Sequence, residues 1–464
     1  MRKYSEEQLS AIKTKHSHTA VIAGAGSGKT TVLIERINEI LKENITPNDI
    51  LAITFTRKAA SEMVERIENK NVNIKTFDAF CYELVLNEFK ENIRIIERSP
   101  FSESEITRFN NYDVNMKKGL KPQKYDEYVN YKKENNLYDF NDIELIALDL
   151  IKKNNITFKY ILIDEFQDTN ELQYLIFKAL IKNNTKTFIV GDPDQSIYGF
   201  RGADFKIIAK YINDYDAKTL ILSNNYRSTK EILNKANNLI VHNKQRIEKE
   251  LIPYTKDVGR VEIRKFHNET FEFEYVIRNY EQLKNKYKSF AILYRNNFQG
   301  NLYKRHFRNE TDDILITTIH QSKGLEFDVV FIIGVNEKIL PADRITKVSE
   351  LEEERRLFFV AITRAKKLLF ISSSTNSNFS GVNMNHKPSK FIRELNIPFK
   401  RKSKIEVIEK EKVKETYQIG DKVKHNNFGE GLIVEVGKRV LTIDFSGEIG
   451  IRKIMANHSS IKKL

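Results

Sequence analysis

The fold class of this chain is indicated most clearly by the stretch Thr19-Ala20-Val21-Ile22-Ala23-Gly24-Ala25-Gly26-Ser27-Gly28-Lys29-Thr30-Thr31. It reads as a short buried strand, a glycine-rich turn and the start of a helix that continues to about Leu41. Parts in this order are typical of a phosphate-binding loop, where backbone N–H groups and a helix N-terminus surround phosphate oxygens. The alternative, a glycine-rich surface turn, fits poorly between a strand and a helix. Ala23 stands where the general motif has glycine.

Two side chains of this turn carry the expected chemistry. We expect Lys29 to reach the β- and γ-phosphates of ATP and to act in catalysis, and the hydroxyl of Thr30 to hold Mg²⁺. The other residues of the turn that are predicted to bind the nucleotide are Ala23, Gly24, Ala25, Gly26, Ser27, Gly28 and Thr31.

A pair of carboxylates supplies the expected partner of the turn. The apolar run Ile161-Leu162-Ile163 ends in Asp164 and Glu165. A strand that ends this way can place Asp164 on Mg²⁺ and Glu165 beside the attacking water. Alone, such a pair is more often a helix cap or a solvated loop. Together with the glycine-rich turn it predicts a nucleoside triphosphatase, and the two motifs indicate nothing narrower.

Strands alternating with helices organise the first 400 residues, which predicts parallel βαβ units and an α/β fold class. A second series of strands begins near residues 219–222. Residues 86–138 are polar and helical in pattern and interrupt the first series. The expected parts are a first α/β domain (1–85 and 139–215), a helical insertion (86–138), a second α/β domain (216–397), a charged linker (398–416) and a small β-barrel (417–464).

The composition limits the classes of function. Among 464 residues, hydrophobic types make up 40% and charged types 30%, and no stretch approaches the roughly 18 apolar residues of a membrane span. The polar N-terminus lacks a signal-peptide core, so we expect a cytoplasmic protein. The lone Cys81 excludes an internal disulfide and a cysteine metal site. The net charge of +14 suits a polyanionic partner, or else reflects a lysine-rich composition.

Further motifs follow in a fixed order along the chain. They lie at Gln8 and at residues 52–60, 76–80, 164–168, 191–203, 225–228, 292–295, 318–327 and 353–365. Together with the phosphate-binding turn they resemble the UvrD/Rep/PcrA-like helicases of superfamily 1, over residues 4 to about 395. The resemblance implies two RecA-like domains with ATP in the cleft between them, 3′-to-5′ movement on single-stranded DNA, and work in DNA repair, replication or conflict resolution.

The resemblance also implies roles for single residues. Gln8 would read the adenine edge, Tyr226 would stack on the ring and Glu326 would contact the ribose. Gln195 would sense the γ-phosphate, and Arg227 and Arg364 would clamp it. An arginine that neutralises transition-state charge in this way can contribute roughly 10³–10⁵ in turnover. For any one arginine, a surface salt bridge is the commoner fate, and only the shared motifs favour the functional role.

For the nucleic acid, the positions that match strand contacts are Phe55, Tyr198, Phe200, Arg201 and His320. Aromatic faces stack on bases regardless of sequence, so single-stranded DNA is the expected partner and RNA is not excluded. For each ring taken singly, core packing is the alternative. The family usually has tryptophan at Phe200, whereas this chain has no tryptophan at all, so less stacking area is expected there.

Residues 417–464 resemble the Tudor-like barrel that ends PcrA-type helicases, which implies a protein partner such as RNA polymerase; we expect a monomer. In place of the family's large insertion in the second domain, only 313 − 299 = 14 residues separate Gln299 from Ile314. That length predicts a turn and a short helix but no domain with its own core. The rival function is an ATP-gated binding factor that docks on a transcription or repair complex with little unwinding.

Overall fold

The computed structural model describes residues 4–90, 93–308, 314–379, 382–396, 417–425, 428–437, 440–446, 449–455 and 461–464. The chain forms two compact units, residues 1–400 and 401–464. The expected charged linker lies outside the described residues. In the part that is described, no helix is both long and apolar enough to cross a lipid bilayer.

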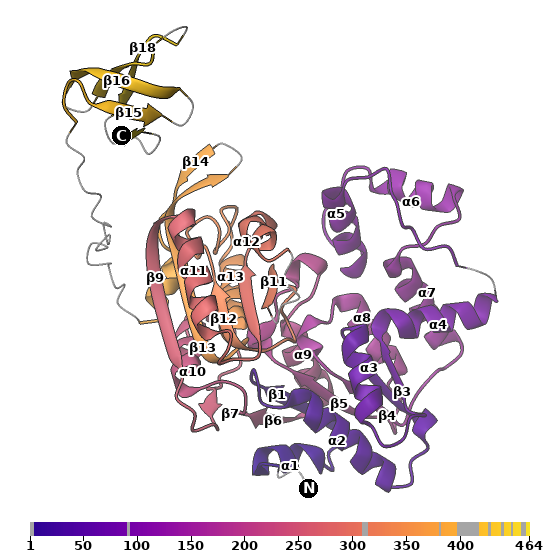
Figure 1. Cartoon of the computed structure of the whole chain (residues 1–464). Helices are drawn as coiled ribbons and strands as arrows, with labels where there is room; N and C mark the ends of the chain where they lie inside the picture. Colours follow the sequence, from indigo (N-terminus) through magenta and orange to yellow (C-terminus); the bar gives the residue numbers. More distant parts are fainter. Residues whose placement is uncertain are drawn as a thin grey trace. The chain divides into compact units, whose positions relative to one another are not determined.

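The first sheet has six parallel strands in the order β3-β2-β4-β5-β1-β6 (Figure 1). They are β1 (His18–Ala23), β2 (Ile50–Thr54), β3 (Asn73–Thr76), β4 (Tyr160–Ile163), β5 (Lys186–Gly191) and β6 (Lys218–Leu222). On β4, Ile161 and Ile163 pack into one core and Tyr160 and Leu162 into another. Both faces of the sheet are therefore covered, which requires the unbroken apolar runs seen in the sequence.

Different helices cover the two faces of this sheet. One core takes residues from α1 (Glu6–Ile12), α2 (Lys29–Lys42) and α3 (Arg57–Arg66). The other takes residues from α4 (Phe77–Phe89), α7 (Phe140–Lys153), α8 (Glu171–Leu180) and α9 (Lys206–Tyr215). Because all six strands run in one direction, the segments that follow β1, β4 and β5 meet at one edge of the sheet.

One strand belongs to a different sheet than expected. The sequence places residues 219–222 in the second series of strands, but this prediction is wrong: β6 pairs in parallel with β1 and forms an edge of the first sheet. Leu222 packs into the core beneath α2, whereas Ile221 is 40% exposed. A short apolar run does not itself reveal which of two parallel sheets it joins. The remaining domain boundaries stay predictions.

Within residues 86–138 the described part contains α5 (Glu103–Val114) and α6 (Tyr125–Glu134). Aromatic rings form a small core of their own here, with Phe109 stacked on Tyr128 at 5.0 Å between centroids. The buried Lys132 lies 2.6 Å from carboxylate oxygens of both Asp139 and Asp142. The helical pattern expected for this segment is therefore present in α5 and α6.

The second sheet has the strand order β11-β10-β12-β13-β14, and β9 also pairs with β13. Its strands are β9 (Arg260–Asn268), β10 (Phe290–Tyr294), β11 (Ile314–Thr318), β12 (Phe327–Ile332), β13 (Ala365–Phe379) and β14 (Val382–Asn385). Only β14 is antiparallel to its neighbour. The accompanying helices are α10 (Lys230–Ile240), α11 (Glu269–Leu283), α12 (Asn301–His306), α13 (Val348–Ile362) and α14 (Lys390–Glu394). Strand β9 is additional to the strands predicted from the sequence; it pairs only with β13 and alternates charged and apolar residues, as an edge strand does.

The connection that is short in the sequence is also short in the structure. A 3₁₀ turn, η5 (Asn297–Gly300), and the six-residue helix α12 follow β10. The next strand described, β11, begins at Ile314. The described part of the connection therefore holds a turn and one short helix.

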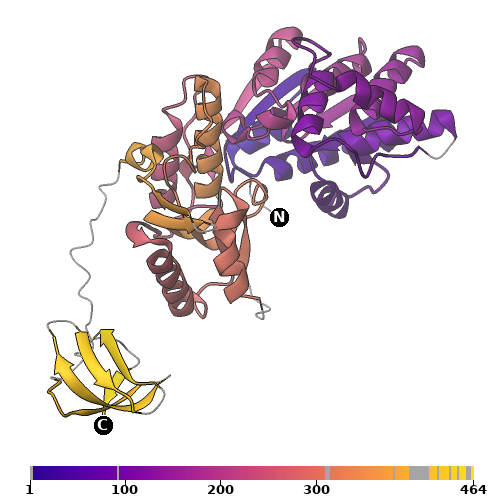
Figure 2. The same cartoon turned by 90° about the horizontal axis from the view of Figure 1, so that it is seen from above.

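The second unit is a five-stranded antiparallel sheet in the order β18-β17-β16-β15-β19, drawn in yellow in Figure 2. Its strands are β15 (Lys422–His425), β16 (Gly429–Val436), β17 (Val440–Asp444), β18 (Ile451–Met455) and β19 (Ile461–Lys463). Residues that alternate along the strands, among them Ile433, Leu441 and Ile443, fill its core. A separate small all-β unit at this end of the chain was expected from that alternation.

Candidate active site and nucleic-acid interface

The glycine-rich turn lies directly between β1 and α2, at the carboxyl edge of the first sheet. Gly26 has a φ of 65°, and a Cβ placed on it would come within 2.6 Å of the Asn225 amide nitrogen. That amide donates to the carbonyl oxygen of Ala25 at 2.6 Å, and the backbone N–H of Tyr226 donates to that of Gly26. These two hydrogen bonds hold the turn against residues 225–226. A side chain at position 26 would prevent so close an approach, so only glycine fits there.

The two motifs that the sequence paired meet in space. Thr30 Oγ1 lies 3.1 Å from Asp164 Oδ2, and Lys29 Nζ lies 3.3 Å from Glu165 Oε2. The backbone N–H of Glu165 also donates to Asp164 Oδ1. A hydroxyl and a carboxylate oxygen at this separation form the hard oxygen donor set that Mg²⁺ prefers.

The pKa values of Asp164 and Glu165 are shifted in opposite directions. Burial, together with the neighbouring Glu165 charge, raises the pKa of Asp164. Burial also acts to raise the pKa of Glu165, but the charges of Lys29 and Lys323 outweigh it and lower that pKa to about 2. Glu165 is therefore ionised at neutral pH and can accept a hydrogen bond from a water molecule.

A pocket of about 650 Å³ opens beside the glycine-rich turn. Its lining residues are Tyr4, Gln8, Gly26, Gly28, Thr31, Tyr226, Arg227, Glu326 and Lys366. Gln8 is buried, and its side-chain amide donates to the carbonyl oxygen of Ser27 at 3.0 Å. The Tyr226 ring lines the pocket, and its centroid lies 4.6 Å from that of Tyr254, with the two rings tilted by 49°. The site is large enough for a nucleotide and carries polar groups at several points of its wall.

Two of the residues predicted to bind the nucleotide are paired with each other in this structure. Arg227 Nε lies 2.6 Å from Glu326 Oε2, and Lys366 Nζ lies 2.8 Å from the other oxygen. Burial acts to raise the pKa of Glu326, but the Arg227 and Lys366 charges hold it below its usual value. A guanidinium of Arg227 that turns to a phosphate must therefore exchange one anion for another.

The last predicted arginine, Arg364, lies close to Arg227, which donates to the carbonyl oxygen of the preceding residue, Thr363. Arg364 comes from the second sheet's domain, and its Nη2 donates to Gln195 Oε1 at 3.2 Å. Its other nitrogens donate to the carbonyl oxygens of Val360 and Leu325. Burial and the nearby Arg227 charge lower the pKa of Arg364 to about 9. Arg364 therefore stays charged at neutral pH and carries a desolvated charge that a phosphate could neutralise.

The five residues predicted to contact a strand gather in one place. Phe55 stacks on Tyr198 with 5.0 Å between centroids, and His320 lies 5.6 Å from the Phe200 ring. The Arg201 guanidinium lies 5.6 Å from the Phe200 ring. Phe200 is 48% exposed, so part of its side chain is accessible to a base. Burial and the neighbouring charges of Arg295, Lys323 and Arg201 lower the pKa of His320 to about 4, so its ring is neutral at pH 7.

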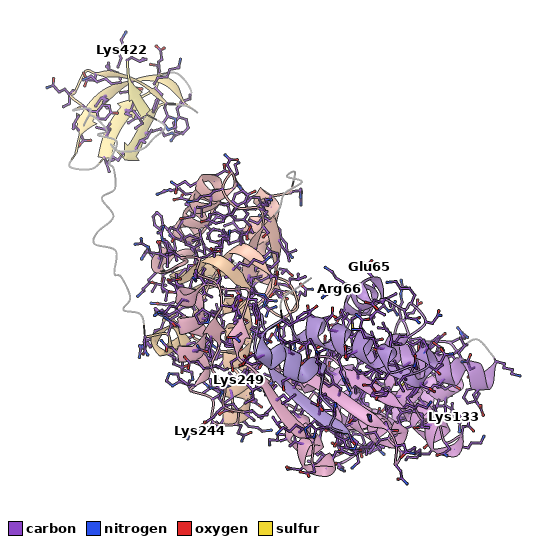
Figure 3. The ribbon with its side chains drawn as sticks, turned by 90° about the horizontal axis from the view of Figure 1, so that it is seen from below. Glu65, Arg66, Lys133, Lys244, Lys249 and Lys422 are labelled. Atoms are coloured by element: carbon purple, nitrogen blue, oxygen red, sulfur yellow. The ribbon has the colours of Figure 1, made fainter. Side chains whose placement is uncertain are left out.

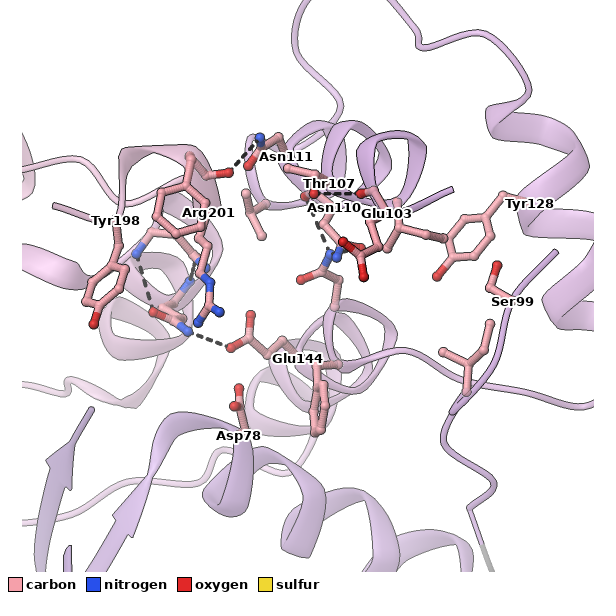
Figure 4. A pocket seen from close by; sticks show the side chains of 18 of the residues that line it. Asp78, Ser99, Glu103, Thr107, Asn110, Asn111, Tyr128, Glu144, Tyr198 and Arg201 are labelled. Carbon is pink, nitrogen blue, oxygen red and sulfur yellow. Dashed lines mark hydrogen bonds between the residues drawn. The ribbon is translucent and has the colours of Figure 1, made fainter. Parts of the chain in front are cut away.

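A pocket of about 760 Å³, lined by both polar and apolar residues, continues from this aromatic cluster towards α5. Figure 4 shows Glu144 and Asp78 between the Tyr198–Arg201 side of the pocket and the Asn110–Asn111 side. Glu144 Oε1 accepts a hydrogen bond from the Gln173 amide at 2.9 Å. Burial raises the pKa of Glu144 to about 8, so this carboxyl is mostly protonated at pH 7. A neutral acid here reduces the repulsion that a phosphate backbone would meet.

Several residues of these two sites were not singled out from the sequence. Tyr4 and Lys366 line the nucleotide pocket, and Tyr254 lies against Tyr226. Lys323 lies 2.5 Å from Asp168 and 4.9 Å from the centre of the Tyr198 ring. Lys323 lies inside the motif at residues 318–327, but the motif alone does not predict its contacts with Asp168 and Tyr198. The assigned roles of all the candidate residues remain predictions.

Comparison with known proteins identifies the class. Residues 4–118 and 96–216 match the UvrD/REP helicase N-terminal domain, and residues 220–311 and 300–376 match the UvrD-like helicase C-terminal domain. Residues 419–463 match the PcrA/UvrD tudor domain. The chain therefore belongs to the UvrD/REP helicase family.

Individual relatives agree with this family. A probable DNA helicase of Mycoplasma pneumoniae is 31% identical, over 85% of this chain and 87% of its own length. The ATP-dependent DNA helicase PcrA of Staphylococcus epidermidis is 25% identical, over 100% of this chain and 99% of its own. A probable DNA helicase II homolog of Mycoplasma capricolum is 27% identical, over 99% of both.

The lengths of these alignments are informative. That with the Staphylococcus protein extends over 722 positions, which is 722 − 464 = 258 more than this chain has residues. The alignment with the Mycoplasma pneumoniae protein extends over only 465 positions. This chain is therefore compact beside its PcrA relative, in agreement with the short connection before β11.

Proposed function

We propose that this chain is an ATP-driven translocase on single-stranded DNA that acts as a helicase. The proposal rests on the segment that follows β5, because this one segment contributes residues to both the nucleotide site and the aromatic cluster. Gln195 is bonded to Arg364, and three residues later Tyr198 lies 6.4 Å from His320 between ring centroids. Arg364 and His320 both belong to the domain of the second sheet. A movement of that domain therefore acts on the nucleotide site and on the strand cluster together.

The residues around the nucleotide pocket suit phosphoryl transfer. Lys29, Arg227 and Arg364 would neutralise charge on the phosphates, and the ionised Glu165 would orient the attacking water. Thr30 and Asp164 would hold Mg²⁺, which supplies further charge neutralisation when bound. Each of these arginines is bonded to a protein oxygen in this structure. ATP would exchange those contacts for phosphate contacts, and hydrolysis would reverse the exchange.

The aromatic cluster suits a single strand better than a duplex. Unpaired bases expose the faces that Tyr198, Phe200 and His320 can stack on, at roughly 1–3 kcal/mol per base. Stacking does not distinguish DNA from RNA, so the choice of DNA relies on the printed names of the relatives. The net charge of +14 favours either polymer.

The finer assignments come from family resemblance. We propose 3′-to-5′ movement, work as a monomer in repair, replication or conflict resolution, and a protein partner such as RNA polymerase for the C-terminal sheet. The match of residues 419–463 to the tudor domain supports the last of these.

The second candidate function is an ATP-gated binding factor that scarcely unwinds duplex. The short connection before β11 favours it, because it leaves no room for a domain that could contact a duplex. This candidate predicts ATP hydrolysis stimulated by single strands without displacement of a protein bound to the strand.

The deciding experiment measures ATP turnover with single-stranded DNA, with single-stranded RNA and with no nucleic acid. A translocase should also displace streptavidin from a biotinylated strand end in an ATP-dependent manner, and from only one of the two ends. Stimulation by DNA without displacement from either end supports the binding factor. No stimulation by either polymer contradicts both functions.

A further inference from the structure

The segment that follows β5 is held by cations of the other domain. Lys249 Nζ lies 2.7 Å from Asp192 Oδ1 and 2.5 Å from Asp194 Oδ2, and all three side chains are at most 2% exposed. Arg246 Nη2 lies 2.9 Å from the same Asp194 oxygen. Figure 3 labels Lys249 at the border between the parts of the chain drawn in purple and in orange-pink. A lysine this deeply buried is rare unless it is paired, as it is here.

Backbone groups of the same segment are held in the same way. Lys323 Nζ donates to the carbonyl oxygen of Gln195 at 2.8 Å, and Arg356 Nε donates to that of Ser196 at 2.8 Å. Residues 192–196 therefore receive hydrogen bonds from Arg246, Lys249, Lys323, Arg356 and Arg364.

Lys249 acts on one side chain of particular interest. Asp192 offers one carboxylate oxygen to Lys249 and the other to Gln195, whose Nε2 lies 2.5 Å away. An ionised carboxylate only accepts hydrogen bonds, so the amide nitrogen of Gln195 must face Asp192. The amide oxygen then faces Arg364, which only donates. The orientation of the Gln195 amide is thus fixed from both sides.

The segment that carries Lys249 does not depend on this ion pair for its own position. The Asn243 amide donates to the carbonyl oxygen of Glu352 on α13, and the backbone N–H of Lys244 donates to the Glu352 carboxylate. At the other end, Leu251 exchanges two hydrogen bonds with the Asn237 side chain on α10. Both ends of the segment that carries Lys249 are therefore anchored within their own domain. The Lys249 side chain is not needed for that and can position residues 192–196 of the other domain.

We propose that Lys249 is a positioning residue for ATP turnover: through Asp192 it fixes the amide of Gln195 in the orientation that accepts from Arg364. This proposal rests on the proposed function, since it assigns Gln195 to the nucleotide site. Without Lys249 the Asp192 carboxylate keeps the backbone N–H of Asp194 but loses its ion pair, and the amide of Gln195 can turn. ATP would still bind, but a smaller share of bound complexes would have the contact between Gln195 and Arg364 in place.

The test is a double-mutant cycle between Lys249→Met and Gln195→Ala in the full chain. Each single change should lower the DNA-stimulated kcat at least tenfold, with the dissociation constant for ATP changed less than threefold. If Lys249 acts through Gln195, the double variant should be no slower than the slower single variant. Lys249→Arg should restore most of the turnover, because a guanidinium can bridge the same two carboxylates.

A matched control separates positioning from simple loss of stability. Lys132→Met removes another buried lysine, 6% exposed, which lies on α6 and bridges Asp139 and Asp142. It should lower the melting temperature comparably and leave kcat per active molecule unchanged when measured well below that temperature. The active fraction is counted by titration with a fluorescent ATP analogue.

Two results would overturn the proposal. One is a Lys249→Met variant whose kcat is within threefold of the parent; the other is a double variant in which the two losses multiply. The cycle is measured on basal turnover as well as on DNA-stimulated turnover. A chain that hydrolyses ATP without responding to DNA would contradict the proposed function and still decide the role of Lys249.

Discussion

Replacing Glu165 by glutamine removes one negative charge and almost no volume. Glu165 Oε2 accepts from Lys29 at 3.3 Å and from the Gln167 amide at 2.5 Å, and a glutamine carbonyl oxygen can keep both contacts. The contact between Thr30 and Asp164 does not involve Glu165. The change therefore tests the proposed base while it leaves the expected Mg²⁺ ligands and the phosphate-binding turn in place.

Loss of a general base typically lowers turnover about 10²–10⁴-fold. At about 1.4 kcal/mol per tenfold change, this corresponds to roughly 3–5 kcal/mol of transition-state stabilisation. Affinity for ATP should stay equal or rise, because the Lys29 ammonium no longer has to leave an ionised carboxylate to reach a phosphate. Affinity for a single strand should be unchanged, since Glu165 is not among the residues that border the aromatic cluster.

The measurements are phosphate release in a single turnover, binding of a fluorescent ATP analogue, and the melting temperature. Glu281→Gln is the matched control, because Glu281 is a surface glutamate paired only with the neighbouring Lys284 among the ion pairs of the described residues. The control should change none of the three quantities. A Glu165→Gln chain that turns over within threefold of the parent would refute the assignment of Glu165 as the base.

Three further outcomes are expected. If the protein neutralises four to six phosphates of a single strand, the logarithm of its affinity for that strand should fall with the logarithm of the salt concentration at a slope of roughly −3 to −4. Arg201→Ala should make that slope shallower by about 0.7. A slope near zero would mean that the net charge of +14 reflects composition and not a binding surface. Burial raises the pKa of Glu144 to about 8 from an unfolded value near 4.5, so its contribution to stability is complete below pH 4.5 and is lost as the pH rises through 8. The unfolding free energy of Glu144→Gln relative to the parent should thus rise between pH 5 and pH 8, by at most about 4 kcal/mol in urea titrations, and an equal difference at both pH values would contradict that protonation. The isolated monomer should reach a labelled strand end efficiently but separate a tailed duplex poorly, because the connection before β11 is short; processive unwinding by the monomer would show that the missing domain is not needed.

Much of the fold and part of the site could be predicted because their signals are local. Lys29 and Thr30 occupy adjacent positions after a strand and a glycine-rich turn, and Asp164 and Glu165 occupy adjacent positions after another strand. Their meeting follows from the parallel direction of β1 and β4, since carboxyl ends share one edge of a sheet. The structure brings the two pairs within 3.3 Å, as the pairing of the two motifs predicted.

What could not be predicted depends on contacts between distant segments. The sheet to which β6 belongs is decided by pairing with β1, about 200 residues earlier, and not by its own composition. Lys249 looks like any other lysine in a charged stretch, yet it is 1% exposed between two aspartates of the other domain. The ion pair between Arg227 and Glu326 could not be predicted either. The family resemblance assigns both residues to the nucleotide and does not indicate that they contact each other.

The stack between Phe55 and Tyr198 has a consequence for how a strand would be held. In this structure each ring already covers a face of the other. Under the proposed role, a base that slides between them gains two aromatic contacts and breaks one, so the net gain is smaller than the gross stacking energy. Weak net attachment at each base lowers the barrier between successive positions along the strand. Such an arrangement favours movement along the strand over tight binding of each base. Contacts from arginine and lysine to the phosphates would then have to prevent dissociation from the strand.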